Sequence, residues 1–208
     1  MTSRELYEIL ASVLSYPTAK IAEQARQIYD HSLSTSASQK SVIAPFSDYV
    51  VESRQEEIEE LFTRTFDMNP TCCLEIGWHK FGEDYQRGEF MVNMRNALEE
   101  EGIPESTELP DHISHCLLLL ARLETPDEFA FSQDFLQPAI EKILDGLEED
   151  NPYASVILFL KGTLELAYGP AKREEENTDS RLIELPMLND SLQYNNLEDM
   201  MDGNGKVR

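Results

Sequence analysis

Residues 109–123 of the chain read LPDHISHCLLLLARL, and this stretch decides the fold. Pro110 fits the first turn of a helix, where its missing N–H costs nothing. Four consecutive leucines follow and leave no polar face, which is typical of a helix in the middle of a domain. Asp111, His112 and His115 would then lie at the N-terminal end of this central helix, where it meets the surface. We therefore expect function at that end.

Apolar residues recur at helical spacing along most of the chain, and no stretch alternates as a β-strand does. The pattern predicts an all-α, single-domain helical bundle. The serine-rich residues 33–41 are expected to form a loop. The last expected helix is apolar on most sides and is a candidate to pack beside the leucine-rich helix. The expected helices cover residues 3–15, 19–31, 46–66, 72–81, 85–101 and 109–123, then one or two helices within 129–150, and 153–167.

The character of the chain changes after residue 169, where a charged run, KREEENTDS, begins. Few apolar residues follow, so we expect residues 1–169 to form the helical domain and residues 170–208 to form an acidic, flexible and mostly disordered tail. The small apolar cluster LIELPML at 182–188 could still dock on the domain or on a partner.

Composition restricts the partners. The chain has 17 Lys and Arg against 40 Asp and Glu, a formal net charge of -23. Nucleic acid would be repelled and a basic peptide attracted, although solubility alone also explains such acidity. No stretch reaches the roughly 18 apolar residues of a membrane span, and the amphipathic N-terminus is unlike a signal peptide, so we expect a cytoplasmic protein. Three cysteines make no disulfide framework.

Signatures of enzymes are missing from the sequence: there is no glycine-rich phosphate loop, no GxSxG and no HExxH. We therefore expect a non-enzyme without a cofactor. The alternative is a metal-binding helical enzyme or sensor, because His112, His115 and Cys116 would share one face of a helical turn. A fourth ligand would have to come from His79 or Cys72. A third option is an acidic helical scaffold without a peptide groove.

Three motifs carry a resemblance to a known family: FDMNP at 66–70, GEDYQRGEFM at 82–91 and ELPDH at 108–112. Their order and spacing resemble the assembly chaperones of molybdenum enzymes, and within these redox enzyme maturation proteins the nitrate reductase delta-subunit group. The resemblance implies an all-helical chaperone without catalytic activity. Such proteins bind the apo catalytic subunit of a molybdopterin oxidoreductase, commonly through its N-terminal segment, and assist cofactor insertion before membrane docking or export.

Positions that match the family motifs give most of the expected peptide-binding site, to which we add Trp78 and His115 from outside those motifs. In this sequence Asp111 is expected to be exposed and to accept hydrogen bonds from a basic peptide, arginine above all, or to cap its own helix, or both. His112 could tune that contact with pH. The expected site comprises Phe66, Asp67, Asn69, Pro70, Trp78, Leu109, Pro110, Asp111, His112 and His115.

Two further positions are expected to be structural. We expect Arg87 to be an ion-pair partner and Gly88 to permit close helix packing. The chain also departs from the family pattern: Ser114 stands where relatives often have proline, and Leu118 where they often have an acid. These departures alter the chemistry expected of the peptide-binding groove. The sequence does not identify which of the related reductases or dehydrogenases contains the bound subunit.

Overall fold

The computed structural model describes residues 1–35 and 37–171, apart from the side chains at 34–37. Within these ranges the protein is all-α, which confirms the predicted fold class, and its only β feature is an isolated bridge. The expected tail, with its cluster at 182–188, lies almost wholly outside the described residues. The helices are α1 (Ser3–Val13), α2 (Ile21–Thr35), α3 (Ala37–Glu52), α4 (Gln55–Phe62), α5 (Ile76–Phe81), α6 (Tyr85–Glu100), α7 (Ile113–Leu120), α8 (Asp127–Phe131), α9 (Gln137–Gly146) and α10 (Pro152–Tyr168), with π-helical turns η1 (Thr63–Asp67) and η2 (Ser132–Leu136).

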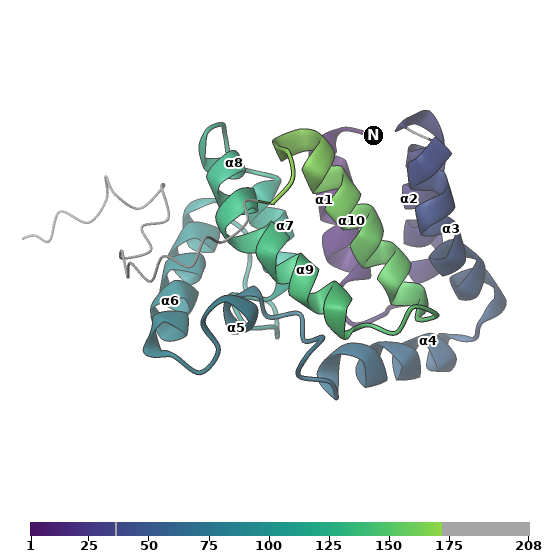
Figure 1. Ribbon diagram of the computed structural model, residues 1–208, viewed down its shortest axis with the longest axis horizontal. Coiled ribbons are helices and arrows are strands. Elements are labelled where there is room, and N and C mark those ends of the chain that lie inside the picture. The colour runs from purple at the N-terminus through teal and green to yellow at the C-terminus, as the bar shows by residue number, and fades with distance from the viewer. Residues whose placement is uncertain (36, 172–208) are drawn as a thin grey trace, which may run out of the picture.

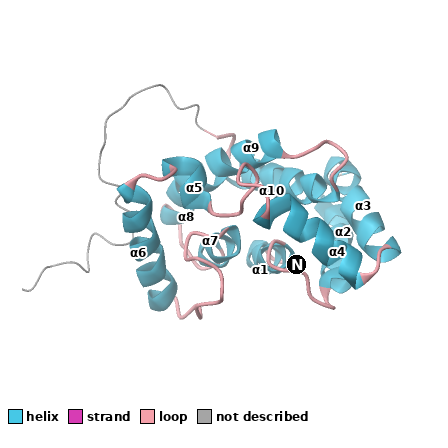
Figure 2. Ribbon diagram, turned by 90° about the horizontal axis from the view of Figure 1, so that it is seen from below, coloured by secondary structure: helices cyan, strands magenta, loops and turns pink. Residues whose placement is uncertain are grey.

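The leucine-rich stretch forms α7, which lies among the other helices as predicted (Figures 1 and 2). Its residues Leu117, Leu119 and Leu120 are buried and Leu118 is half-buried. The main partner of α7 is α1. We expected α10 as a candidate to pack beside α7. This expectation is wrong for its main contacts, because α10 packs mainly along α3 and α9.

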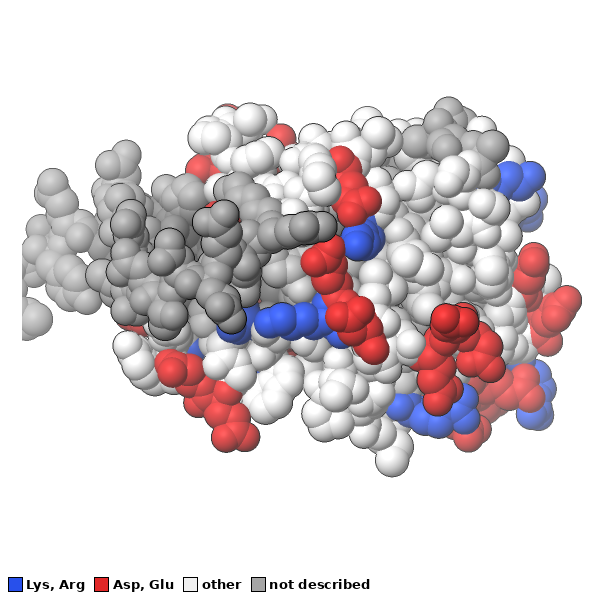
Figure 3. Space-filling model, viewed as in Figure 1, with Lys and Arg blue, Asp and Glu red and all other residues white. Residues whose placement is uncertain are grey.

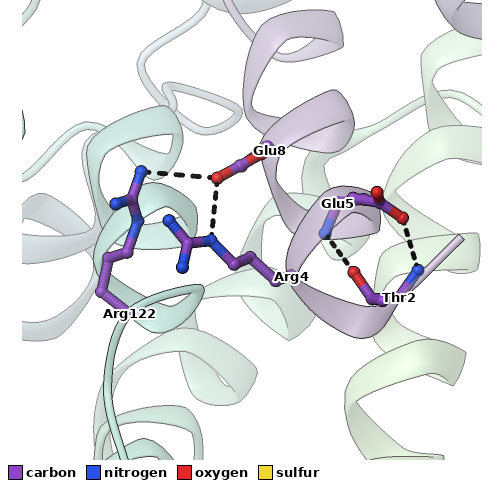
Figure 4. A network of polar contacts seen from close by, with 5 residues as sticks. All are labelled: Thr2, Arg4, Glu5, Glu8 and Arg122. Atoms are coloured by element: carbon purple, nitrogen blue, oxygen red, sulfur yellow. Dashed lines mark hydrogen bonds and ion pairs between the residues drawn. The ribbon is translucent and has the colours of Figure 1, made fainter.

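Polar contacts stabilise the first turns of α1 and link this helix to the segment after α7 (Figure 4). The side chain of Thr2 accepts from the backbone N–H of Glu5, whose carboxylate accepts from the Thr2 N–H, a capping box that satisfies two free donors. One turn further along, Glu8 accepts from both Arg4 and Arg122. The second of these contacts ties α1 to the segment that follows α7.

The loop expected at residues 33–41 is wrong, because α2 and α3 are helical through most of it. Serine remains compatible with a helix when its hydroxyl bonds a preceding backbone carbonyl. Ser32 donates to the carbonyl of Tyr29, and Ser41 donates to that of Ser38. The serine-rich composition therefore marks helix ends here and not an extended loop.

The helix expected at 46–66 is also different in the structure. It begins earlier, so that Pro45 lies inside α3, where it removes a backbone hydrogen bond at a cost of about 3 kcal/mol. Burial of Phe46, whose ring centroid lies 5.1 Å from that of Tyr153 on α10, offsets that cost. The chain then breaks at residues 53–54 before α4 starts.

Acidic side chains gather over α4 on the face shown in Figure 3, at its lower right. The sequence of α4, QEEIEELF, contains four glutamates, and its Ile58, Leu61 and Phe62 are buried. None of the described helices is both long and apolar enough to cross a membrane.

Candidate functional site

A surface cavity of about 360 Å3 opens where the three sequence motifs meet. It lies among the end of α4, the turn η1, helix α5 and the segment that leads into α7, with Arg87 reaching it from α6. Its walls combine aromatic and aliphatic side chains with three acids. The cavity is lined by Phe62, Phe66, Asp67, Pro70, Cys73, Leu74, Glu75, Trp78, Arg87, Glu108, Leu109 and His112.

A short backbone bridge joins the two segments that form the inner wall of the cavity. Glu75 and His112 face each other in an isolated antiparallel bridge. The N–H of Ile76 donates to the carbonyl of Asp111 over 2.8 Å, and the N–H of Ile113 donates to the carbonyl of Leu74 over 2.7 Å. Because these bonds fix the starts of both α5 and α7, the side chains at 75 and 112 hold a fixed relation to each other.

Asp111 is fully buried, so the expectation of an exposed, peptide-binding carboxylate is wrong. Its Oδ2 accepts from Nε of Arg87 over 2.9 Å, and the guanidinium of Arg87 lies over the Trp78 ring, 5.6 Å from its centroid. The ion-pair role predicted for Arg87 is confirmed. Oδ1 of Asp111 has no hydrogen-bond partner among the described residues. The carboxylate therefore serves to hold Arg87 and Trp78 at the cavity wall.

Gly77, which the sequence did not single out, makes this buried pair possible. A Cβ at position 77 would lie 2.6 Å from Oδ2 of Asp111 and 3.0 Å from the ring of Phe90. The close-packing role expected of Gly88 is wrong, because that residue is exposed and an added Cβ would meet nothing within 4 Å. The only sign of this role in the sequence is that Gly77 stands beside Trp78. The contact that requires a glycine is with Asp111, 34 positions away in the sequence.

His112, and not Asp111, caps α7. Its Nδ1 accepts from the backbone N–H of Ser114, 3.2 Å away, and lies 2.7 Å from the Ser114 hydroxyl. Burial, and then the nearby charge of His115, lowers the pKa of His112 to about 3. The imidazole is therefore neutral near pH 7 with its proton on Nε2, which makes His112 a hydrogen-bond donor at the cavity wall and contradicts the expected pH tuning.

The π-turn η1 places Phe66 and Asp67. The N–H of Met68 donates to the carbonyl of Thr63, five residues back, so the turn holds one residue more than an α-helical turn. Phe66 is buried against Phe62, with ring centroids 5.1 Å apart, while the next residue, Asp67, is exposed. The two residues thus supply an apolar wall and a charge to the same cavity.

Three carboxylates line the cavity without a counter-ion: Asp67, Glu75 and Glu108 form no ion pair with any described residue. Burial raises the pKa of Glu108, and the negative charges of Asp67 and Glu75 raise it further. Since Arg87 is engaged by Asp111, the cavity has negative charge to offer to a cation. Glu108 begins the ELPDH motif, but the sequence prediction did not select it as a site residue, and nothing in the sequence marked Glu75.

The metal alternative finds no support in the geometry. His115 bonds to the carbonyl of Leu109 and to Ser106, and the thiol of Cys116 donates to the carbonyl of Asp111 over 3.7 Å. His112, which caps its helix, lines the cavity instead. Within residues 1–35 and 37–171, no group of three or more His, Cys, Asp or Glu side chains is arranged to hold a metal ion.

Six of the ten predicted site residues lie around the one cavity: Phe66, Asp67, Pro70, Trp78, Leu109 and His112. The other four lie elsewhere. Pro110 and Asp111 are buried. His115 lines a different pocket together with Ser106 and Leu118. Asn69 lines a separate polar cavity, where its amide forms hydrogen bonds with Thr71 and Cys72.

One family model, described as nitrate reductase delta subunit, matches residues 34–157, which is 124 of the 208 residues. The match spans all three sequence motifs and every residue that lines the cavity. A search of curated proteins gave no match.

Proposed function

The chain belongs to the nitrate reductase delta subunit family, which confirms the resemblance read from its motifs, and on that premise we propose that it is an assembly chaperone for a molybdenum enzyme. Its partner is the apo catalytic subunit of a molybdopterin oxidoreductase. It binds the N-terminal segment of that subunit in the cytoplasm and keeps the subunit ready for cofactor insertion. It catalyses no reaction itself.

The observation that carries this proposal is the chemistry of the cavity. Phe66, Trp78 and Leu109 offer apolar surface to one face of an amphipathic segment, and each aliphatic side chain buried there contributes about 1.5–3 kcal/mol. The carboxylates of Asp67 and Glu108 offer charge to an arginine or lysine on the same segment, each such partly exposed pair contributing up to about 1 kcal/mol.

His112 adds a directional contact. Its neutral ring has Nδ1 engaged by Ser114, so the Nε2–H is free to donate to a backbone carbonyl of the bound segment. A donor at a fixed position selects the direction in which an extended or helical segment lies. Apolar burial, charge and one oriented donor together favour a basic amphipathic peptide over an acidic or wholly polar one.

Deletion and complementation test the proposal. In the native host, loss of the gene is expected to leave the catalytic subunit of one molybdenum enzyme short of molybdenum and inactive, and the wild-type chain is expected to restore both. The variant Asp67→Asn/Glu75→Gln/Glu108→Gln should restore them only in part. Full molybdenum content and activity in the deletion strain would show that the proposed function is wrong.

A matched control separates the cavity from net charge. Glu56, Glu60 and Glu89 are exposed and form no ion pair with a described residue. Their triple replacement by glutamine changes the net charge by the same three units and is expected to complement as the wild type does. If both triple variants fail equally, the general acidity of the protein, and not the cavity, is what matters.

A further inference from the structure

His115 does not line the cavity, and both of its ring nitrogens form hydrogen bonds with the segment that forms the cavity rim. Nδ1 lies 2.8 Å from the carbonyl oxygen of Leu109, and Nε2 lies 3.0 Å from the hydroxyl of Ser106. The same hydroxyl accepts from the backbone N–H of Glu108 over 3.1 Å. One buried side chain on the first turn of α7 therefore reaches the rim at two points.

The rim segment depends on such contacts because it has no helix of its own. Residues 104–109 are irregular and mostly exposed, and yet Glu108 and Leu109 line the cavity. The carbonyl of Leu109 also accepts from the N–H of His112 over 3.0 Å, which closes a turn onto α7. His115 supplies the side-chain hydrogen bonds that tie the rest of this segment to α7.

We propose that His115 is a positioning residue for peptide binding: through Leu109 and Ser106 it sets where Leu109 and Glu108 stand at the cavity. It does not touch the peptide. This inference rests on the proposed function, and it assigns to His115 a role different from the direct peptide contact expected from the sequence.

The physical reason is preorganisation. A loose rim would have to be ordered when the peptide binds, and ordering a residue costs about 1–2 kcal/mol. Fixing the rim beforehand removes that cost from the binding step. The hydrogen bonds of His115 should therefore increase the affinity for the peptide, even though His115 lies outside the cavity.

The test combines two variants with a measurement of peptide affinity. His115→Phe keeps the ring but removes both hydrogen bonds, and the exposed Ser106→Ala removes only one bond to the ring together with the bond from the N–H of Glu108. The probe is a synthetic peptide of the first 20 residues of the catalytic subunit of the molybdenum enzyme that the deletion experiment identifies. We expect His115→Phe to weaken binding about three- to tenfold and Ser106→Ala to weaken it less.

A double-mutant cycle distinguishes positioning from a general loss of structure. In a Glu108→Gln/Leu109→Ala background, the effect of His115→Phe on affinity is expected to fall below about twofold, because the side chains through which it acts are gone. His115→Asn, whose amide can still donate to the Leu109 carbonyl, should recover part of the affinity. An undiminished effect in that background would overturn the proposal.

Hydrogen exchange gives a readout that needs no ligand. The amide of Glu108 is bonded to Ser106, so its exchange should accelerate at least tenfold in His115→Phe while amides within α10 keep their rates. Unchanged exchange at Glu108 would refute the positioning role. If the wild-type chain binds no peptide at all while exchange at Glu108 responds as expected, the proposed function fails and the structural link between His115 and the rim stands.

Discussion

The buried ion pair between Arg87 and Asp111 allows a quantitative prediction. Arg87→Met keeps most of the side-chain volume but leaves the Asp111 carboxylate, which is 0% exposed, without its cation. Since Oδ1 of Asp111 already has no partner among the described residues, nothing else can compensate the charge. Leaving a buried charge unpaired costs about 3–5 kcal/mol, and we expect the free energy of unfolding to fall by that amount.

The reverse substitution should cost less. Asp111→Asn removes the charge but keeps the shape, and the Arg87 side chain, which is 19% exposed, can turn its guanidinium toward water. We expect a loss of about 1–3 kcal/mol, the range for a hydrogen bond to a charged group. The double variant Arg87→Met/Asp111→Asn should be more stable than Arg87→Met alone.

Urea denaturation followed by circular dichroism measures these differences, because the only tryptophan lies at the pair and its fluorescence would itself change. Arg95 and Glu105 provide the matched control: their nitrogen and oxygen lie 2.7 Å apart, but the side chains are 53% and 63% exposed. Arg95→Met should cost less than about 1 kcal/mol. Equal losses for Arg87→Met and Arg95→Met would refute the reasoning, because burial would then have no effect.

Further predictions concern the same region. Gly77→Ala should destabilise the protein by about 1–3 kcal/mol because its Cβ would meet the Asp111 carboxylate, whereas Gly88→Ala, in open space within α6, should stabilise by about 0.5–1 kcal/mol; thermal unfolding of both variants checks this. Because the pKa of His112 is about 3 in the folded protein and about 6.5 when unfolded, the unfolded state binds more protons between these values, so stability should fall by up to about 1.4 kcal/mol per unit as pH drops below 6.5. Urea titrations at pH 5, 6 and 7 should show this slope reduced in His112→Asn. Burial raises the pKa of the Cys73 thiol to about 12, so its alkylation by iodoacetamide at pH 8 should be much slower than that of free cysteine.

The helical periodicity was enough to predict the fold class and the central place of α7, because burial of apolar faces dominates helix packing. Local departures from α-helix could not be predicted in this way. Serine and proline between residues 32 and 45 have loop propensities. The segment is helical nevertheless, because Ser32 and Ser41 donate to backbone carbonyls and because α3 packs against α10. The π-turn η1 has no sequence signature, although it decides where Asp67 points.

The motifs were enough to locate the cavity, but they did not predict the role of each residue. In the sequence, an acid before a helix is typical of a helix cap or of a ligand-binding residue. Only the contacts of Asp111 with Gly77 and Arg87 show that it is a buried residue that holds Arg87 in place. His115 was selected because it lies at the N-terminal end of the leucine-rich helix, yet its ring contacts Ser106 and Leu109 and does not line the cavity. Pairings between residues far apart in the chain set these roles, and one sequence does not contain them.

The central claim is tested most directly by titrating the wild-type protein with the N-terminal 20-residue peptide of the molybdenum enzyme's catalytic subunit. Trp78 is the only tryptophan and lines the cavity, so a peptide without tryptophan that binds there should change its fluorescence along a saturable curve. The same peptide with each arginine and lysine replaced by glutamine should bind at least tenfold more weakly, and so should the original peptide to Asp67→Asn/Glu75→Gln/Glu108→Gln. Binding that is insensitive to both changes, or that leaves Trp78 fluorescence unaltered, would contradict a peptide site in this cavity.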